Sequence, residues 1–286
     1  MIRLVASDLD GTLLKSDGTI SQKNIEMIQA LNRKGVVFTA ASGRNYTGVH
    51  ALFAGKKVSY EAILANGAEY VDEEGMLLST RYFNKKIVRE LLKLFDFNGI
   101  PSMMFTTAGV CTHMDEEAGR RAYRKRMLAR QGFRREDLEK PEVVRSIPAM
   151  NMTGIRYVDA LLKSDTEILK LECYDMEQDQ MVQIGNALKK YPDIVYFSSA
   201  GDNYEITDAA ATKGKILLEQ CERKGIRPDE VLVIGDGLND LSMFACFPHS
   251  VCVSDGMAEL KEKAEWIAPA ASEDGFAAAV KHYIVF

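Results

Sequence analysis

The sequence predicts an α/β fold, in which a parallel sheet with helices on both faces is interrupted by an inserted α+β module. Short apolar segments alternate with segments of helix length at both ends of the chain, as expected for parallel strands that are buried on both faces. Between residues 83 and 197 this alternation changes to a different mixture of strands and helices. The 286 residues also exceed the roughly 100–200 residues of one typical domain.

The first portion of the chain carries three short apolar runs that are typical of buried strands, at residues 2–7, 36–40 and 62–65. Between the first two runs, Ser21 is a suitable N-cap and Gly35 a suitable stop for a helix. Residues 68–71 and 76–79 flank the turn-forming sequence D-E-E-G, so a hairpin is expected there.

The middle portion is expected to form a separate α+β module. Its expected strands lie at 102–106, 110–113 and 168–173, and its expected helices at 84–97, 120–135 and 177–190. The opening pattern then resumes, with helices expected at 213–224 and 273–283 and strands at 231–234 and 251–253. The predicted organisation is therefore a core domain of residues 1–82 and 198–286, with a module of residues 83–197 inserted in it.

Composition excludes several classes of protein. No apolar run approaches the roughly 18 residues of a membrane span, and the amino terminus lacks the apolar region of a secretory signal. The five cysteines are scattered and form no C-x-x-C pair, which argues against a disulfide framework or a structural zinc site and favours the cytoplasm. The net charge of −5 disfavours nonspecific binding of nucleic acid.

Two carboxylates directly follow the first expected strand, in Asp8-Leu9-Asp10-Gly11-Thr12. Ligands of an open parallel sheet bind at the carboxyl ends of its strands, and residues two apart in an extended segment point the same way. A divalent cation would relieve the repulsion between the two groups. One could then serve as metal ligand and nucleophile, and the other as general acid and base. A solvated turn or a calcium-type loop is the alternative interpretation.

A second acidic segment, Gly235-Asp236-Gly237-Leu238-Asn239-Asp240, follows the strand expected at 231–234. Mg²⁺ takes oxygen ligands, commonly one or two carboxylates with waters and a substrate phosphate, and Asp236 fits that role. Helix capping by Asn239 or Asp240 is the alternative. Capping alone does not explain why three such side chains gather at the end of one strand.

Two further positions suit a phosphate group. Ser42-Gly43-Arg44 offers a hydroxyl and backbone N–H groups at a strand-to-helix turn. Lys213 begins an expected helix, where a cation is unfavourable beside the positive end of the helix dipole. Binding phosphate and neutralising a nucleophile would explain that placement. Taken alone, each position is more simply interpreted as an ordinary turn or a solvated lysine.

The order of these segments resembles the haloacid dehalogenase superfamily, and most closely its Cof-type branch of sugar-phosphatase-like proteins. The resemblance covers the whole chain and includes Asn66-Gly67-Ala68 and Asp274-Gly275-Phe276. It implies a Rossmann-like core with an α/β cap domain inserted between the second and third motifs, where the pattern of this chain changes.

The resemblance also implies a Mg²⁺-dependent phosphatase that acts through an aspartyl-phosphate. Asp8 would attack phosphorus, while Asp10 would protonate the leaving oxygen and then activate water. The implied metal ligands are the carboxylates of Asp8 and Asp236 and the backbone carbonyl of Asp10. The implied phosphate-binding groups are Ser42, the backbone amides of Leu9 and Gly43, Lys213 and Asn239. Asp240 would support Lys213 or the metal from behind.

One segment departs from the family pattern. Family members usually continue after the fourth motif with a Gly-rich stretch that contains M-G-N-A. The corresponding residues 251–257 here read V-C-V-S-D-G-M. The departure leaves the expected catalytic positions intact and is expected to affect only the shape of the rim of the active site.

The inserted module is expected to choose the substrate, which could be a hexose phosphate, a flavin or pyridoxal phosphate, or another monoester. Its basic stretch at 120–135 could steer anions, but a solvated helix balanced by Asp115, Glu116 and Glu117 is favoured. The four methionines at 103, 104, 150 and 152 could line a pocket, although core packing is favoured.

Three functions are compatible with these features. A phosphomonoester hydrolase that acts on small phosphorylated metabolites is favoured. A phosphotransferase such as a phosphomutase would use the same aspartyl-phosphate and exclude water. A non-catalytic regulator would bind a phosphorylated ligand, but such a protein need not retain both Asp8 and Asp10.

Overall fold

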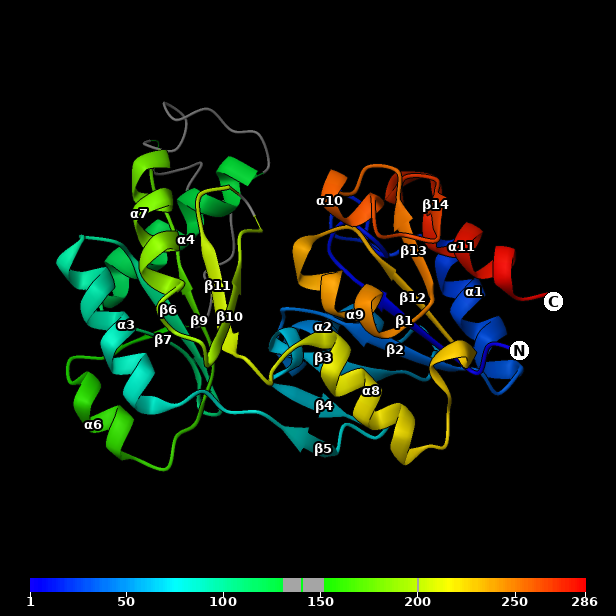
Figure 1. Ribbon diagram of the computed structural model, residues 1–286, viewed down its shortest axis with the longest axis horizontal. Helices are drawn as coiled ribbons and strands as arrows, with labels where there is room; N and C mark the ends of the chain where they lie inside the picture. Colours follow the sequence, from blue (N-terminus) through cyan, green and yellow to red (C-terminus); the bar gives the residue numbers. More distant parts are fainter. Residues whose placement is uncertain (131–139, 141–151, 200) are drawn as a thin grey trace. The chain divides into compact units, whose positions relative to one another are not determined.

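The fold is described from a computed structural model, which describes residues 1–130, 140, 152–199 and 201–286. These residues form two compact units (Figure 1). The first unit comprises Met1–Arg81 and Ala209–Phe286, and the second comprises Tyr82–Asp208. The second unit is therefore inserted in the sequence of the first.

The first unit is built on a sheet with the strand order β14-β13-β12-β1-β2-β3-β4-β5. From β14 to β3 neighbouring strands are parallel, whereas β4 and β5 add an antiparallel hairpin at one edge. The predicted parallel sheet is confirmed. The strands are β1 (Leu4–Asp8), β2 (Val37–Ala41), β3 (Glu61–Leu64), β4 (Glu69–Val71), β5 (Leu77–Thr80), β12 (Val231–Gly235), β13 (His249–Val253) and β14 (Trp266–Ala268).

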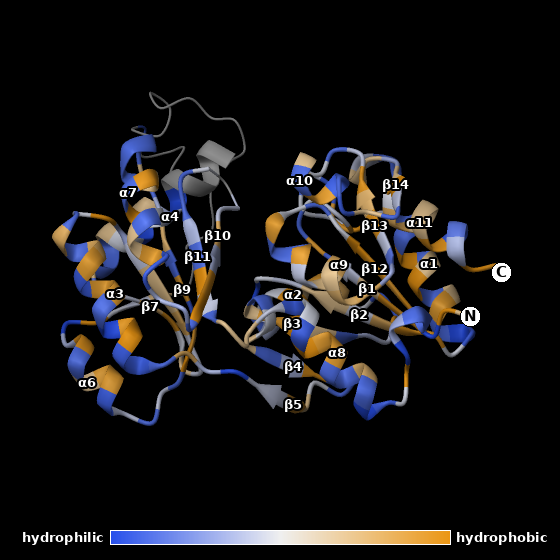
Figure 2. Cartoon of the chain, in the orientation of Figure 1, coloured by the Kyte–Doolittle hydropathy of each residue, from blue (hydrophilic) through white to orange (hydrophobic). Residues whose placement is uncertain are grey.

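Helices cover both faces of this sheet (Figure 1). Leu232 and Ile234 of β12 pack in the core that α1 and α11 share, whereas Val231 and Val233 pack in the core of α8 and α9. Because both faces are buried, the central strands consist mostly of apolar residues (Figure 2), and even their polar members Ser7, Asp8 and Thr39 are buried. The helices are α1 (Gln22–Arg33), α2 (Tyr46–Phe53), α8 (Lys213–Arg223), α9 (Leu241–Cys246), α10 (Ala258–Lys261) and α11 (Gly275–Tyr283).

Helix α1 shows how local sequence sets an element. The Ser21 hydroxyl accepts the Asn24 N–H at 3.1 Å and so satisfies one of the amides that the first turn leaves unpaired. Ile28 and Leu31 are fully buried on the inner face of the helix. Gly35 follows the helix with a φ of +70°, a left-handed conformation that glycine adopts without strain. The helix therefore starts and stops where the sequence predicts.

The second unit contains a sheet with the order β10-β11-β9-β6-β7-β8. Its core is formed by apolar side chains of that sheet and of α3 and α7, among them Phe95, Leu171 and Ile184. The strands are β6 (Ser102–Thr106), β7 (Gly109–Thr112), β8 (Met152–Gly154), β9 (Ile168–Cys173), β10 (Ile194–Phe197) and β11 (Tyr204–Asp208). The helices are α3 (Lys85–Phe97), α4 (Glu116–Arg130), α6 (Val158–Lys163) and α7 (Gln178–Leu188).

The second unit extends beyond the boundary expected at residue 197. Strand β11 pairs antiparallel with both β10 and β9, so it is an interior strand of the second sheet. Ile206 of this strand is fully buried in the core of the second unit. The chain therefore returns to the first unit only after Asp208. A role of the second unit as a cap stays a prediction.

Two sequence features of the second unit have packing roles. Met103, Met104 and Met152 are almost fully buried, and Met104 belongs to the hydrophobic core, whereas Met150 lies outside the described residues. Arg120 forms an ion pair with Glu116 at 2.7 Å and donates to the Met152 carbonyl at 3.1 Å. These contacts agree with the favoured interpretation of a helix whose charges are balanced. The part of the basic stretch beyond residue 130 lies outside the described residues.

Within the described ranges, no helix combines the length and the apolar character needed to cross a membrane.

Candidate active site

The candidate site lies at the carboxyl ends of four neighbouring parallel strands, β12, β1, β2 and β3. Asp8 ends β1, Ser42 directly follows β2, Ala65 follows β3 and Asp236 follows β12. Because these strands are adjacent and parallel, their ends meet at one edge of the sheet. Segments separated by more than 200 residues of sequence are thereby brought together.

A buried ion pair network forms the centre of this edge. The Lys213 ammonium donates to Oδ1 of Asp8 at 2.5 Å and to Oδ1 of Asp240 at 2.7 Å. The side chains of Lys213 and Asp240 are fully buried, and that of Asp8 is 5% exposed. A charge in such a place is stable only when it is paired and hydrogen-bonded. The lysine that is unfavourable beside a helix N-terminus is thus compensated by two carboxylates.

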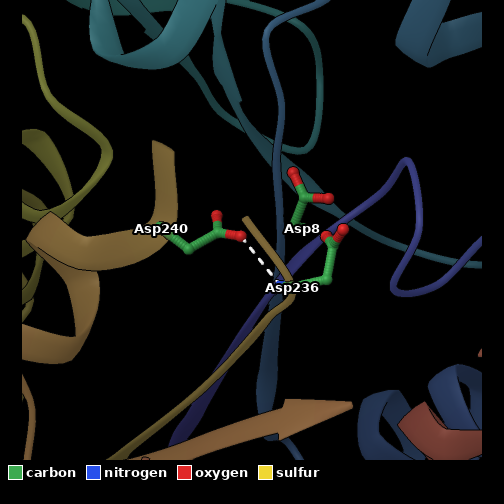
Figure 3. Close-up of side chains that lie close together, drawn as sticks. All are labelled: Asp8, Asp236 and Asp240. Carbon is green, nitrogen blue, oxygen red and sulfur yellow. Dashed lines mark hydrogen bonds between the residues drawn. The ribbon is translucent and has the colours of Figure 1, made fainter. Parts of the chain in front are cut away.

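Asp240 joins this network to the end of β12. Its second oxygen, Oδ2, accepts the Asp236 N–H at 3.0 Å and the Gly237 N–H at 3.2 Å, and Figure 3 shows it reaching back to Asp236. In these contacts Asp240, the third residue of the 3₁₀ turn Leu238–Asp240, caps the start of that turn, whereas its side chain makes no capping bond with any described residue as the N-cap of α9, so the predicted N-cap role is wrong for α9. The same carboxylate holds Lys213 with its other oxygen, so the capping and lysine-holding roles coexist.

Asp236 is held beside Asp8 by the segment that follows β1. The Thr12 hydroxyl donates to Oδ1 of Asp236 at 2.8 Å. Gly11 has a φ of +90°, and a Cβ there would lie 2.5 Å from Oδ2 of Asp236. Glycine is therefore required at position 11 both by its backbone conformation and by the close approach of the carboxylate.

Three carboxylates consequently share a small volume. One oxygen each from Asp8, Asp236 and Asp240 lies within 4.8 Å of the others (Figure 3). Burial, together with the neighbouring carboxylates, raises the pKa of Asp8 well above its usual value, against the opposing effect of Lys213. Burial and Asp240 raise the pKa of Asp236 to about 6. Burial alone would lower the pKa of Lys213, but Asp240 and Asp8 outweigh it and raise that pKa above its ordinary value.

This donor set fits a divalent cation. Three carboxylates and one ammonium leave the cluster with excess negative charge, which a hard cation with oxygen ligands would neutralise. Asp240 already uses one oxygen for Lys213 and the other for backbone amides. Lys213 takes only one oxygen of Asp8, and Thr12 takes only one of Asp236. Asp8 and Asp236 are therefore the better ligands, and Asp240 is the better support.

The Ser42 loop is fixed by hydrogen bonds to the end of β3. The Ser42 N–H donates to the Ile63 carbonyl at 2.8 Å, and the Asn66 N–H donates to the Ser42 carbonyl at 3.0 Å. The Ser42 hydroxyl accepts the Arg44 N–H at 3.1 Å. Ser42 is almost fully buried and Gly43 is half-buried. This loop has the rigid backbone that a phosphate-binding loop requires.

The segment Ala65–Gly67 connects this loop to Lys213. All three of its residues have positive φ angles, 47° for Ala65, 62° for Asn66 and 114° for Gly67. A Cβ at Gly67 would lie 2.5 Å from the backbone carbon of Thr212, the N-cap that precedes Lys213. Left-handed backbone costs free energy at non-glycine residues and persists where the surroundings enforce it. The segment thus sets the spacing between the Ser42 loop and the start of α8.

Asp10 lies outside the buried network. Its side chain is 58% exposed, and both of its oxygens accept from Arg44, with Nε to Oδ2 at 2.8 Å and Nη2 to Oδ1 at 2.6 Å. Of the remaining expected site residues, Leu9 is fully buried and Asn239 is half-buried in the 3₁₀ turn after β12.

The segment that departs from the family pattern lies directly against Asp236. The Met257 N–H donates to the Asp236 carbonyl at 2.8 Å. A Cβ at Gly256 would lie 3.0 Å from the Asp236 Cα. The altered sequence therefore retains a glycine at the position that packs on the backbone of Asp236.

Sequence reasoning assigned no role to Thr12, Arg44 or Gly67. Thr12 belongs to the segment 8–12 and Arg44 to the segment 42–44, so their positions within these two motifs could have indicated a role in the site. The partners of Thr12 and Gly67 are 224 and 145 positions away in the chain. Those two roles become visible only when the strand ends are assembled.

Known proteins share this architecture. The chain matches the family model of haloacid dehalogenase-like hydrolases over residues 5–280. It is similar in structure to a haloacid dehalogenase-like hydrolase from Bacillus subtilis, with a TM-score of 0.86, 24% identity and coverage of 99% of this chain and 100% of the other. A hydrolase of the same description from Bacteroides thetaiotaomicron gives a TM-score of 0.77 with 20% identity, at 99% and 100% coverage.

Curated relatives share most of the chain. The 5-amino-6-(5-phospho-D-ribitylamino)uracil phosphatase YwtE of Bacillus subtilis is 26% identical over 276 residues, which is 96% of each chain. The HMP-PP phosphatase of Serratia proteamaculans is 23% identical over 272 residues, covering 91% of this chain and 87% of the relative. These phosphatases confirm the class of enzyme that the sequence predicts.

Proposed function

Because this chain belongs to the haloacid dehalogenase-like hydrolase family, we propose that it is a Mg²⁺-dependent phosphatase that hydrolyses small phosphorylated metabolites through a phosphorylated Asp8. The observation that carries the proposal is the buried Lys213 between Asp8 and Asp240, with Asp236 in the same cluster. This arrangement concentrates charge where a phosphoryl group would be transferred.

The first step is transfer of the phosphoryl group to Asp8. A carboxylate oxygen of Asp8 forms a bond to phosphorus while the bond from phosphorus to the leaving oxygen breaks. Asp10 gives its proton to that leaving oxygen and becomes a carboxylate. Lys213 opposes the rise in the pKa of Asp8 that burial causes, and its hydrogen bond to Oδ1 holds the carboxylate in place.

The second step is hydrolysis of the aspartyl-phosphate. A water oxygen attacks phosphorus, and the bond to Asp8 breaks with its electron pair returning to the Asp8 carboxylate. The water proton passes to the Asp10 carboxylate, which restores the acid for the next cycle. Two easier steps thereby replace one difficult step.

Asp8 and Asp236 would hold Mg²⁺ by their carboxylates, with the Asp10 carbonyl as a third protein ligand, and the bound cation would neutralise the phosphoryl oxygens. The phosphoryl group would be held by the Ser42 hydroxyl, the Leu9 and Gly43 amides, Lys213 and Asn239. The rigid Ser42 loop supports that assignment, because donors held in position lose little entropy when the group binds.

The proposed substrates are phosphate esters of small metabolites. YwtE is named for a phosphorylated ribitylamino-uracil and the Serratia relative for HMP-PP, so relatives of this chain act on small phosphorylated compounds. We propose the same broad class here, with the second unit as the part that selects the leaving group. We also propose a cytoplasmic location, on the cysteine pattern of the sequence.

Phosphate release from 4-nitrophenyl phosphate tests the proposal. We expect turnover with Mg²⁺ and its loss on addition of a chelator, with recovery when Mg²⁺ is restored. Equal turnover with and without the chelator would contradict the metal requirement. A panel of phosphorylated metabolites that includes bisphosphorylated sugars would then rank substrates, and isomerised sugar phosphate without free phosphate would indicate a mutase instead.

A further inference from the structure

The turn after β1, residues 9–14, carries two groups of the candidate site, Asp10 and Thr12. The Leu9 carbonyl organises this turn, because it accepts the Thr12 N–H at 3.2 Å and the Leu13 N–H at 3.1 Å. These hydrogen bonds are internal to the turn. They give the turn its shape, but they do not fix its place against the rest of the first unit.

The side chain of Asn24, on α1, connects the turn to a second element. Its Nδ2 donates to the Leu13 carbonyl at 3.3 Å, and its Oδ1 accepts the Ala277 N–H at 3.2 Å. Ala277 lies in the first turn of α11, where a helix leaves backbone N–H groups without a partner inside the helix. The amide of Asn24 therefore joins the turn after β1 to the start of α11.

The chemistry of this bridge requires an amide. A backbone carbonyl can only accept and a backbone N–H can only donate, so the Asn24 side chain must present its nitrogen to Leu13 and its oxygen to Ala277. Asn24 is fully buried, as are Leu13 and Ala277. An apolar side chain of similar size would leave the carbonyl and the N–H without this partner. The bridge thus holds the Leu13 carbonyl in one position.

The position of Leu13 bears directly on the site, because Thr12 precedes it in the chain. The Thr12 hydroxyl donates to Oδ1 of Asp236 at 2.8 Å. Gly11 approaches the same carboxylate so closely that a Cβ there would lie 2.5 Å from Oδ2. Contacts of this kind weaken steeply when their geometry is disturbed. A shift of the turn would therefore move Thr12 against Asp236, and it would also move the backbone carbonyl of Asp10.

We propose that Asn24 is a positioning residue for the Mg²⁺ site. By holding the Leu13 carbonyl, it fixes the turn from which Thr12 orients Asp236 and from which Asp10 offers its carbonyl. The inference rests on the proposed function. Groups that orient the ligands of a metal typically change its affinity by about 10- to 100-fold when they are removed. Loss of the Asn24 amide should therefore weaken binding of Mg²⁺ in protein that is still folded.

Asn24→Leu tests this role with two readouts. The first is the Mg²⁺ concentration that gives half of the maximal phosphate release from 4-nitrophenyl phosphate. The second is the affinity for Mg²⁺ obtained without substrate, from the dependence of the unfolding temperature on Mg²⁺ concentration. We expect the variant to need about 10-fold more Mg²⁺, or more, in both measurements. If Asn24→Leu does not fold, Asn24→Ser is the milder variant and should change both readouts in the same direction.

The matched control is Asn32→Leu, on the same helix. The Asn32 amide also bridges backbone groups, since its Nδ2 donates to the Ser59 carbonyl at 3.0 Å and its Oδ1 accepts the Ser59 N–H at 2.9 Å. This control should lose stability but keep the wild-type affinity for Mg²⁺. Wild-type affinity in the Asn24 variants, or an equal loss in Asn32→Leu, would overturn this inference alone. A wild type that Mg²⁺ neither stabilises nor activates would overturn the proposed metal site as well.

Discussion

Two ion pairs meet at the end of β1 in opposite environments. Lys213 pairs with Asp8 and Asp240 where all three side chains are at most 5% exposed, while Arg44 pairs with Asp10 at the surface. Breaking a buried pair leaves a charge without water or partner, whereas an exposed pair can exchange partners at small cost. The difference suits the proposed division of labour, in which the nucleophile stays fixed and the acid–base group changes its bonding within each cycle.

The most severe test of the buried network is Asp8→Asn. Removing the nucleophile should lower kcat by on the order of 10⁴-fold or more. The fold should persist, because the buried Lys213 keeps its ion pair with Asp240 at 2.7 Å and an amide oxygen at position 8 can still accept a hydrogen bond from it. Phosphate release and thermal unfolding measure the two effects. Substantial residual turnover in a folded variant would contradict the role of Asp8.

Lys213→Met compares the two environments by stability. The variant leaves Asp8 and Asp240 buried without their cation, so the free energy of unfolding should fall by about 3–5 kcal/mol. Arg44→Gln, which breaks the exposed pair, should cost about 1 kcal/mol or less. Denaturant unfolding in the presence of a chelator gives both values. Similar costs for the two variants would contradict the distinction between fixed and exchangeable pairs.

Gly67→Ala tests how the buried lysine is positioned. A Cβ at Gly67 meets the backbone of Thr212, so the start of α8 must shift, and activity should fall about 10- to 100-fold. Gly55→Ala is the matched control, because Gly55 also has a positive φ, but among the described residues no heavy atom comes within 4 Å of where its Cβ would lie. That control should lose stability without losing activity. Equal activity in the two variants would contradict the inference that Gly67 positions the start of α8.

The smallest expected effect concerns pH. Because the pKa of Asp236 is raised to about 6, the folded protein without metal retains a proton between about pH 4 and 6 that the unfolded chain has released. The contribution of this group to stability therefore falls as pH rises across that window. Asp236→Asn should lack this fall, so it should gain stability relative to the wild type from pH 4 to 7. Parallel unfolding curves across this range would contradict the raised pKa.

The fold could be predicted from the sequence where burial on both faces requires a strand of apolar residues only, or where a helix has a clear cap and stop. The strand at 231–234 is apolar throughout because both of its faces are covered, and α1 has both a cap and a stop. Strand β11, with sequence Y-E-I-T-D, is not uniformly apolar. Its short alternation of apolar and polar residues is compatible with a half-buried strand but does not say to which sheet the strand belongs. Its place is decided by pairing with β10 and β9, which local patterns do not encode.

The candidate site was predictable to the level of motifs. Acids at strand ends indicated a metal and a nucleophile, and the order of motifs indicated Lys213. The partners of Lys213 lie 205 and 27 positions away, and the contact between Arg44 and Asp10 spans 34 positions. Such contacts depend on which strands are neighbours, and therefore on the assembled sheet.

The most direct measurement is the chemical identity of the phosphorylated residue. The wild-type protein would be mixed with substrate and Mg²⁺, quenched in acid and treated with borohydride, which reduces an aspartyl-phosphate to homoserine. Mass spectrometry of the peptides would then locate the modified position. We predict homoserine at position 8, and its absence when substrate is omitted. Modification at another carboxylate, or phosphate release without any modified peptide, would contradict Asp8 as the nucleophile.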